Sequence, residues 1–140
     1  MSARGVKAAA TEEASMTKKR MTVWNRKMDL EVVFDRYAGE DVSADQEKAL
    51  ESLLSNWAVV NGCLEDVKRY CLDNGGGVVA GEHVDNVFKY VKPESLYVPR
   101  RQRKRTVAIM CGFRPNPEHG LAIVFENEKL AKIGQQDIIL

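Results

Sequence analysis

Apolar and polar residues alternate early in the chain. Leu30, Val32 and Phe34 alternate with Glu31, Val33 and Asp35. A period of two is typical of a strand with at least one buried face. We therefore expect the first strand of the fold to begin near residue 29.

A long segment with the period of a helix follows this strand. Ser43 and Gln46 have the spacing of a capping box, which predicts the helix start. An unbroken helix over residues 44–72 would be about 43 Å long, so we expect a break near Asn61-Gly62. Asn74 and the glycines after it predict the helix end. The apolar residues recur at steps of three and four and form one core-facing stripe: Leu50, Leu53, Leu54, Trp57, Val60, Leu64, Val67 and Cys71.

The second half of the chain reads as a series of short strands. Residues 106–113 are apolar on both faces, which predicts a central strand. Before it we expect only a short helix over residues 82–88 and a short extended piece over residues 95–98. After it we expect strands at 121–125, 130–133 and 138–140. This order predicts an α+β domain, with a mainly antiparallel sheet and one or two helices packed on one face.

The composition fits one globular domain preceded by a basic segment. The chain has 140 residues, of which 44% are hydrophobic, enough for a single core. The residues before Asp29 include seven lysines and arginines but only two glutamates, although the whole chain has a net charge of +1. Few large apolar residues accompany them, so we expect residues 1–28 to be disordered and residues 29–140 to form the domain. Trp24 would then be an exposed anchor, whereas Trp57 would lie in the core.

The three cysteines indicate a reducing compartment. Cys63, Cys71 and Cys111 are an odd number without the spacing of a disulfide framework, so we interpret them as buried thiols. No stretch reaches the roughly 18 apolar residues that cross a bilayer, and the N-terminus lacks the apolar centre of a secretory signal. We therefore expect a cytoplasmic protein with no membrane partner.

The sharpest charged feature is the run RRQRKR, with five cations in six positions: Arg100, Arg101, Arg103, Lys104 and Arg105. Such clusters bind phosphate backbones, but they also occur in exposed loops and on sheet edges, where they discourage association between sheets. Stacking aromatic residues are not interleaved with the run. Three interpretations stay open: a loop or edge, a surface for an acidic protein partner, and a nucleic-acid site.

Glu118 and His119 form the second candidate site. A histidine beside a carboxylate can act as a general base or bind a metal. The neighbouring residues are those of a turn, however, and no nucleophile or further ligand accompanies the pair. We interpret the segment as a turn before a strand, with a partner contact as an additional role. We expect no catalytic residue, no metal and no cofactor.

The C-terminal residues resemble a bacterial family of small domains of unknown function. Its members close with HG, an apolar strand with Phe, a polar turn and IGxQD; here these positions are His119, Gly120, Phe125, Ile133, Gly134, Gln136 and Asp137. Glu128 departs from this pattern, in which a hairpin glycine is usual. Such domains look like relatives of those encoded near bacterial toxin systems, some of which are immunity proteins that block a toxin by binding it. The resemblance implies a binding role and no established catalysis.

These features lead to three hypotheses about function. The first is a cytoplasmic, non-enzymatic, protein-binding domain, immunity-like, that uses Arg100, Arg101, Arg103, Lys104, Arg105, Glu118 and His119 against a partner such as a toxin. The second is a nucleic-acid-binding domain that uses residues 100–105. The third is a metal-dependent or hydrolytic enzyme that uses His119 with Glu118.

Overall fold

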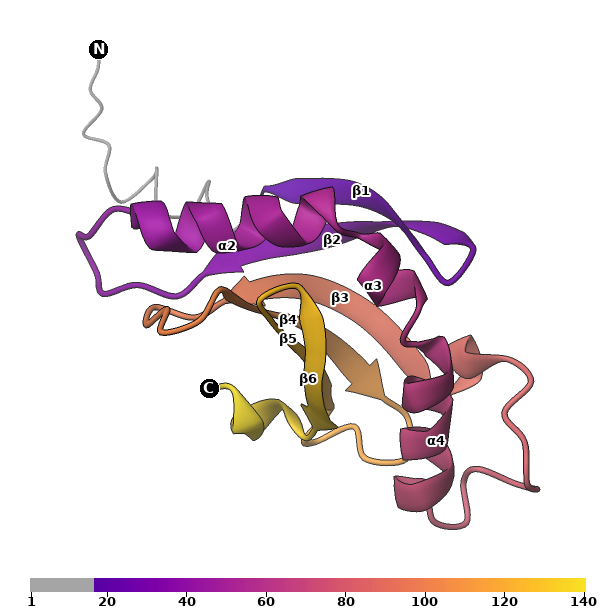
Figure 1. The fold of residues 1–140 in the computed structure, drawn as a ribbon. Coiled ribbons are helices and arrows are strands. Elements are labelled where there is room, and N and C mark those ends of the chain that lie inside the picture. The colour runs from indigo at the N-terminus through magenta and orange to yellow at the C-terminus, as the bar shows by residue number, and fades with distance from the viewer. Residues whose placement is uncertain (1–16) are drawn as a thin grey trace.

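The structure is a computed structural model that describes residues 17–140. Its main element is a six-stranded sheet with the strand order β1-β2-β3-β4-β5-β6 (Figure 1). The strands are β1 (Lys18–Val23), β2 (Arg26–Phe34), β3 (Val91–Val98), β4 (Thr106–Phe113), β5 (Leu121–Glu126) and β6 (Lys129–Gly134). The helices among the described residues are α2 (Ala44–Ser55), α3 (Ala58–Asn61) and α4 (Leu64–Asn74), with the short 3-10 helices η1 (Val87–Lys89) and η2 (Gln136–Ile138).

The pairing of the strands confirms an α+β fold with a mainly antiparallel sheet. Neighbouring strands run antiparallel except for β2 and β3, which are parallel, with Glu31 opposite Ser95 and Phe34 opposite Val98. Parallel neighbours need a long crossover connection. Residues 35–90 supply it, and they carry α2, α3 and α4.

The first strand lies in the basic segment, where we expected disorder. Lys18 pairs with Glu31 and Val23 pairs with Arg26, so β1 and β2 form a hairpin with the two-residue turn Trp24-Asn25. Lysines and arginines fill most of the exposed positions of β1, and this basic composition hides the period of a strand. The predicted disorder of residues 1–28, and with it a domain start at residue 29, is wrong for residues 18–28. Residues 1–16 lie outside the described part.

Trp24 is buried at the tip of this hairpin, which corrects the prediction of an exposed anchor. Only 6% of the residue is exposed. Its indole Nε1 donates a hydrogen bond to the carbonyl oxygen of Val60 at 3.0 Å, and its backbone N donates to Asn61 Oδ1 at 2.8 Å. Its ring centroid lies 5.8 Å from that of Phe88. The hairpin tip is therefore fixed between α3 and the segment of η1.

The long helical segment is broken twice. α2 begins at the predicted capping box, because Ser43 and Gln46 exchange side-chain hydrogen bonds at 3.0 and 3.1 Å. The break expected near Asn61-Gly62 separates α3 from α4, and a second break at Asn56-Trp57 separates α2 from α3. The described residues thus hold three α-helices, where we expected one or two. None of these helices is long and apolar enough to cross a membrane.

The strands of the second half agree with the sequence patterns more closely than the segments between them. β4 spans the predicted residues 106–113, and β5 and β6 lie within one residue of the expected strands at each end. β3 is longer than expected, since it begins at Val91 and accommodates Pro93 at an irregularity of the register. The helix expected over residues 82–88 is wrong, because only η1 forms there, and residues 138–140 are not a strand.

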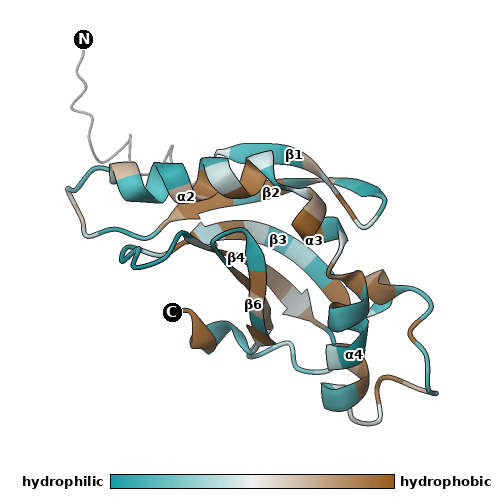
Figure 2. Ribbon diagram, in the orientation of Figure 1, coloured by the Kyte–Doolittle hydropathy of each residue, from teal (hydrophilic) through white to brown (hydrophobic). Residues whose placement is uncertain are grey.

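The sheet buries apolar side chains on both faces. The larger cluster joins side chains of α2, α3 and α4 to alternate strand positions such as Leu30, Leu96, Ile109 and Ile123. α2 lies against β3 and β4, and α3 and α4 lie against the edge strand β6. Figure 2 shows hydrophobic residues along β2 and the inner side of α2, and hydrophilic residues in the loops where β2 and β3 end. The smaller cluster comprises Ala108, Met110, Ala122 and Val124, with Tyr97, Ile138 and Ile139 packed against it.

Candidate functional site

The structure places the two predicted groups of site residues at opposite ends of β4. The basic run precedes β4, whereas Glu118 and His119 follow it. β4 has eight residues, and strands rise about 3.3 Å per residue, so the two groups are separated by about 25 Å. They do not form one site, and each is considered separately.

The basic run forms the loop between β3 and β4, and part of its charge is neutralised by carboxylates. Arg100 Nη2 lies 3.6 Å from Asp35 Oδ2, and Lys104 Nζ lies 3.7 Å from Glu126 Oε1. Arg105 makes two hydrogen bonds to Glu128, from Nε at 2.7 Å and from Nη2 at 3.0 Å. These bonds raise the pKa of the Arg105 guanidinium. Three of the five cations therefore already have anionic partners.

Arg101 and Arg103 differ from the other three cations. Both are exposed, and neither forms an ion pair with any residue from 17 to 140. Lysine and arginine side chains that lack a partner are the ones available to an external anion. The positive charge of this loop that is free for binding therefore centres on these two arginines.

Side-chain amides hold the loop in place. Gln102 Nε2 donates to the carbonyl oxygens of Pro99 at 2.9 Å and Thr106 at 3.0 Å, while its Oε1 accepts from Thr106 N at 2.7 Å. Gln46, only 2% exposed, donates from Nε2 to the carbonyl oxygens of Asp35 at 2.6 Å and of Pro99 at 3.2 Å. Buried amides with satisfied hydrogen bonds rigidify their surroundings. The loop thus presents Arg101 and Arg103 from a fixed frame.

An exposed aromatic ring lies beside the loop. Tyr37 follows β2 and is 57% exposed. The guanidinium carbon of Arg100 lies 3.7 Å from the centroid of its ring, a cation–π contact. Asp35 pairs with Arg100 and also hydrogen-bonds Tyr97; burial first, and then this carboxylate, raise the pKa of the Tyr97 hydroxyl to about 12. We call Tyr37 and residues 100–105 the basic end.

Tyr37 in the basic end and Glu128 beside it were not predicted as site residues. Tyr37 comes from a loop far from the run in sequence, so a search for aromatic residues interleaved with the cations misses it. Glu128 stands where the resemblance implies a hairpin glycine, and its carboxylate holds Arg105. The acidic residues near the start of α2, including Asp35, offered the one available signal, because clusters of opposite charge tend to pair.

His119 lies in the turn that we predicted. Its side chain is exposed, and its Nδ1 lies 3.1 Å from Asn116 Oδ1. Its backbone carbonyl oxygen accepts from Gln136 N at 3.0 Å, and Gln136 Nε2 donates to the carbonyl oxygen of Cys111 at 3.0 Å. Gly120 has a φ of +61°, and a Cβ there would lie 2.6 Å from Gln136 Nε2. The HG and IGxQD words therefore fasten η2 to the start of β5, and this role uses the backbone of His119.

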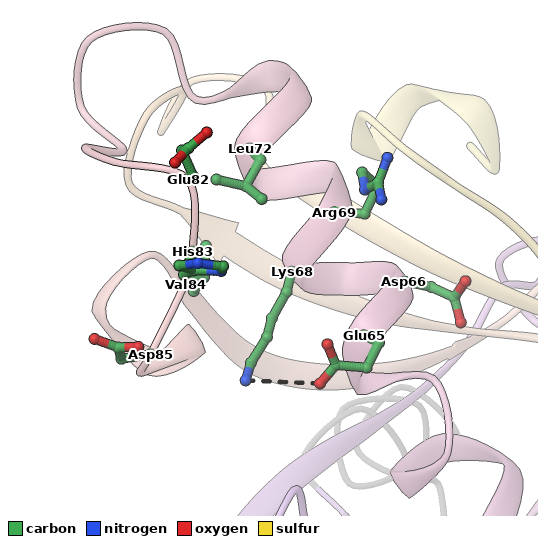
Figure 3. A pocket seen from close by; sticks show the side chains of 9 residues that line it. All are labelled: Glu65, Asp66, Lys68, Arg69, Leu72, Glu82, His83, Val84 and Asp85. Carbon is green, nitrogen blue, oxygen red and sulfur yellow. Dashed lines mark ion pairs between the residues drawn. The ribbon is translucent and has the colours of Figure 1, made fainter.

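The second histidine, His83, lines an open groove of about 750 Å³ between α4 and the segment before η1. Figure 3 shows Glu82, His83 and Asp85 on the segment that faces α4, with Lys68 extended toward Glu65, 3.7 Å away. None of the nine lining side chains is a serine, threonine or cysteine, so no hydroxyl or thiol nucleophile accompanies the imidazole in this groove. His119 does not line it.

Residues 17–140 contain no group of three or more His, Cys, Asp or Glu side chains that could hold a metal ion. The three cysteines are free and buried, as predicted. Burial raises the pKa of Cys63 to about 12 and that of Cys71 to about 11, and it raises the pKa of Cys111 as well. Reactive thiols have lowered pKa values, so these three have the character of core residues.

Comparison with known proteins identifies a family for this chain. No curated protein and no solved structure matches it. One family model does match, over residues 8–140, which begins upstream of β1 and includes the whole described fold. The chain therefore belongs to the family described as Domain of unknown function (DUF6985).

Proposed function

We propose that this domain is a non-catalytic protein-binding module that contacts an acidic partner with the basic end. The observation that carries the proposal is the pair Arg101 and Arg103, which are exposed and unpaired among residues 17–140 and stand on a loop fixed by Gln102 and Gln46. A rigid loop loses little conformational entropy on binding, so more of the interaction energy appears as affinity.

The chemistry of the basic end also supports a protein partner. Tyrosine and arginine are enriched among the residues that dominate protein interfaces, and Tyr37 stacks against Arg100, which belongs to the same loop as Arg101 and Arg103. Unpaired cations steer an acidic partner toward the surface and raise the association rate at low salt. Glu118 and His119 lie at the other end of β4, so the proposed interface excludes them.

The setting that we propose is immunity-like: a bacterial cytoplasmic domain that blocks a toxin by occupying its surface. The resemblance of the C-terminal words supports this setting, and the free, buried cysteines fit a reducing compartment. A toxin gene beside the gene of this protein would supply the partner to test. Co-expression of that toxin with the wild-type domain should restore growth, and the R101A/R103A variant should not.

Affinity capture tests the protein partner. Tagged domain should retain a partner from the native lysate at 50 mM salt and lose it as salt increases, because exposed charges are screened. The R101A/R103A variant should lose the same partner. The K89A/R114A variant is the matched control. It removes two exposed cations at the ends of β3 and β4 that lie away from the basic end. Equal capture by R101A/R103A and wild type would refute the proposal.

Single-stranded nucleic acid is the second candidate ligand, and Tyr37 is the observation that favours it. Bases stack on exposed aromatic rings beside cationic grooves, and each such contact contributes about 1–3 kcal/mol. We expect Y37A to weaken binding of a labelled oligonucleotide roughly 5-fold to 100-fold at low salt, and R101A/R103A/K104A to abolish the gel shift. No shift by the wild-type domain at low salt would remove this candidate.

A further inference from the structure

A small hollow lies beside the basic end, on the side of α2. Its volume is about 220 Å³. Three segments form its walls: the first turns of α2, the loop between β3 and β4, and the β5–β6 turn. The lining residues are Asp45, Lys48, Gln102, Arg103, Lys104, Arg105 and Asn127.

The walls of this hollow are held by bonds that need no ligand. Asn127 N donates to the carbonyl oxygen of Arg105 at 2.8 Å, and Asn127 Oδ1 accepts from Arg105 N at 3.3 Å. Glu128 holds the Arg105 guanidinium through two hydrogen bonds. Since Asn127 uses its amide oxygen in this way, its amide NH2 remains as a donor for something else.

The charge of the lining is unbalanced toward the positive. Four of the lining residues are cations and Asp45 is the one carboxylate. Lys104 and Arg105 already pair with Glu126 and Glu128 outside the lining. Lys48 and Arg103 form no ion pair with a described residue. These two cations are therefore the side chains that an anion in the hollow would meet.

The size of the hollow selects the class of ligand. Sites for drug-sized molecules occupy about 300–1,000 Å³, so this hollow is too small for them. A water molecule takes about 30 Å³, which leaves room for a small ion with a few waters. Arginine presents a fork of donors that matches phosphate oxygens, and lysine adds a mobile point charge.

We propose that this hollow binds a phosphate-class oxyanion, held by Arg103 and Lys48, with the side-chain amide of Asn127 as a further donor. The proposal goes beyond the proposed function, because it names a ligand chemistry and a site whose residues Lys48 and Asn127 lie outside the basic end. The carboxylate of Asp45 opposes the anion, so we expect dissociation constants in the millimolar range for the free ion. The ligand is either the free ion or a phosphoryl group on a serine side chain.

An NMR titration tests the proposal with inorganic phosphate as the probe. We expect saturable shifts of the backbone amides of Lys48, Arg103, Lys104 and Asn127, and no such shifts with sodium chloride at equal ionic strength. K48A/R103A should weaken binding at least 10-fold, and D45N should tighten it several-fold. The matched control K89A/R114A should leave it unchanged.

Two results would overturn the proposal: equal shifts in chloride, or saturable shifts that K48A/R103A does not alter. O-phosphoserine in the same titration identifies the source of the ligand. Tighter binding of O-phosphoserine than of inorganic phosphate assigns a phosphorylated side chain, and equal binding assigns the free ion.

The single variant K48A separates this proposal from the proposed function. It should weaken phosphate binding and leave capture of an acidic partner intact, because Lys48 lies outside the basic end.

Discussion

The β1–β2 turn and the β5–β6 turn both have positive φ values, but their side chains have different roles. Trp24 and Asn25 join β1 to β2 with φ values of 49° and 70°, and Asn127 and Glu128 join β5 to β6 with 51° and 60°. None of the four is glycine, although a left-handed backbone disfavours other residues. Trp24 is buried in the core, whereas Glu128 holds the basic loop through Arg105.

In both turns a residue other than glycine adopts a positive φ, and its side chain makes contacts that a glycine could not make. At the first turn the side chain stabilises the fold, because Trp24 fills a site between α3 and Phe88. At the second turn the side chain orders a loop that carries unpaired arginines. Strain retained at Glu128, whose half-buried side chain lies outside the apolar core, is an indication of function, whereas strain at Trp24 is explained by packing of its buried ring.

The largest effect is expected at the first turn. W24A should lower the free energy of unfolding by about 3–5 kcal/mol, because it leaves a cavity and removes the hydrogen bond to Val60. Urea denaturation measures this change. W24F keeps most of the ring and is the control, with a smaller loss. A loss below about 1 kcal/mol in W24A would show that the first turn does not anchor the hairpin.

The next effect concerns Cys63, which lies in the same part of the core. Burial raises the pKa of its thiol to about 12, from an ordinary value of 9.0. Below pH 9 the thiol is protonated in both states, and its contribution to stability is complete. As pH rises from 9 toward 12, only the unfolded state releases the proton, so stability should fall by about 1.4 kcal/mol per pH unit for each such thiol.

Denaturation of wild type and C63A between pH 8 and pH 11 measures this dependence. The C63A variant should show a shallower loss of stability above pH 9, even if it is less stable at pH 8. The same slope in both proteins would mean that the thiol of Cys63 ionises freely in the folded state.

A smaller effect is expected when a glycine is placed in each of the two turns. E128G removes the strain of a non-glycine residue in a left-handed backbone, about 1 kcal/mol, but it releases Arg105. We expect an unchanged or higher melting temperature together with faster amide exchange in residues 100–105. N25G is the matched change at the first turn and should leave that loop unaffected. If E128G left exchange in the loop as slow as in wild type, Glu128 would not be what orders it.

The smallest effect is expected at His119. H119A should change the free energy of unfolding by less than about 0.5 kcal/mol, because the exposed ring hydrogen-bonds no side chain of residues 17–140 other than Asn116, and the turn is held by its backbone. Thermal denaturation checks this value. Q136A should be more destabilising than H119A, since Gln136 donates to the carbonyl oxygen of Cys111. The reverse order would point to a role of the imidazole that the structure does not explain.

The sequence predicts those parts of the fold whose signals are local. The capping box at Ser43 and Gln46 and the doubly apolar strand at 106–113 depend on neighbouring residues alone, and both are correct. β1 was missed because its apolar positions are few and its lysines resemble those of a disordered segment. The parallel pairing of β2 with β3 depends on contacts across the crossover, which no local pattern specifies.

The basic end, like the fold, could be predicted only where its signal is local in the sequence. The basic run was visible, but its division into paired and unpaired cations was not. That division depends on Asp35, Glu126 and Glu128, which approach it only in the folded sheet. Tyr37 and Lys48 join the run from other elements for the same reason. The HG and IGxQD motifs can be recognised in the sequence, but the hydrogen bond between them is seen only in the folded protein.

The crossover between β2 and β3 sets the order in which the sheet can assemble. Short connections join β3, β4, β5 and β6, so these strands can pair early in folding. β2 can pair with β3 only after the long crossover of residues 35–90 has closed. On the ribosome the order of emergence is the opposite, and the β1–β2 hairpin leaves the exit tunnel first. Until Val98 has followed, the nascent chain carries an unpaired edge on β2. That interval is when a chaperone would matter most for this protein.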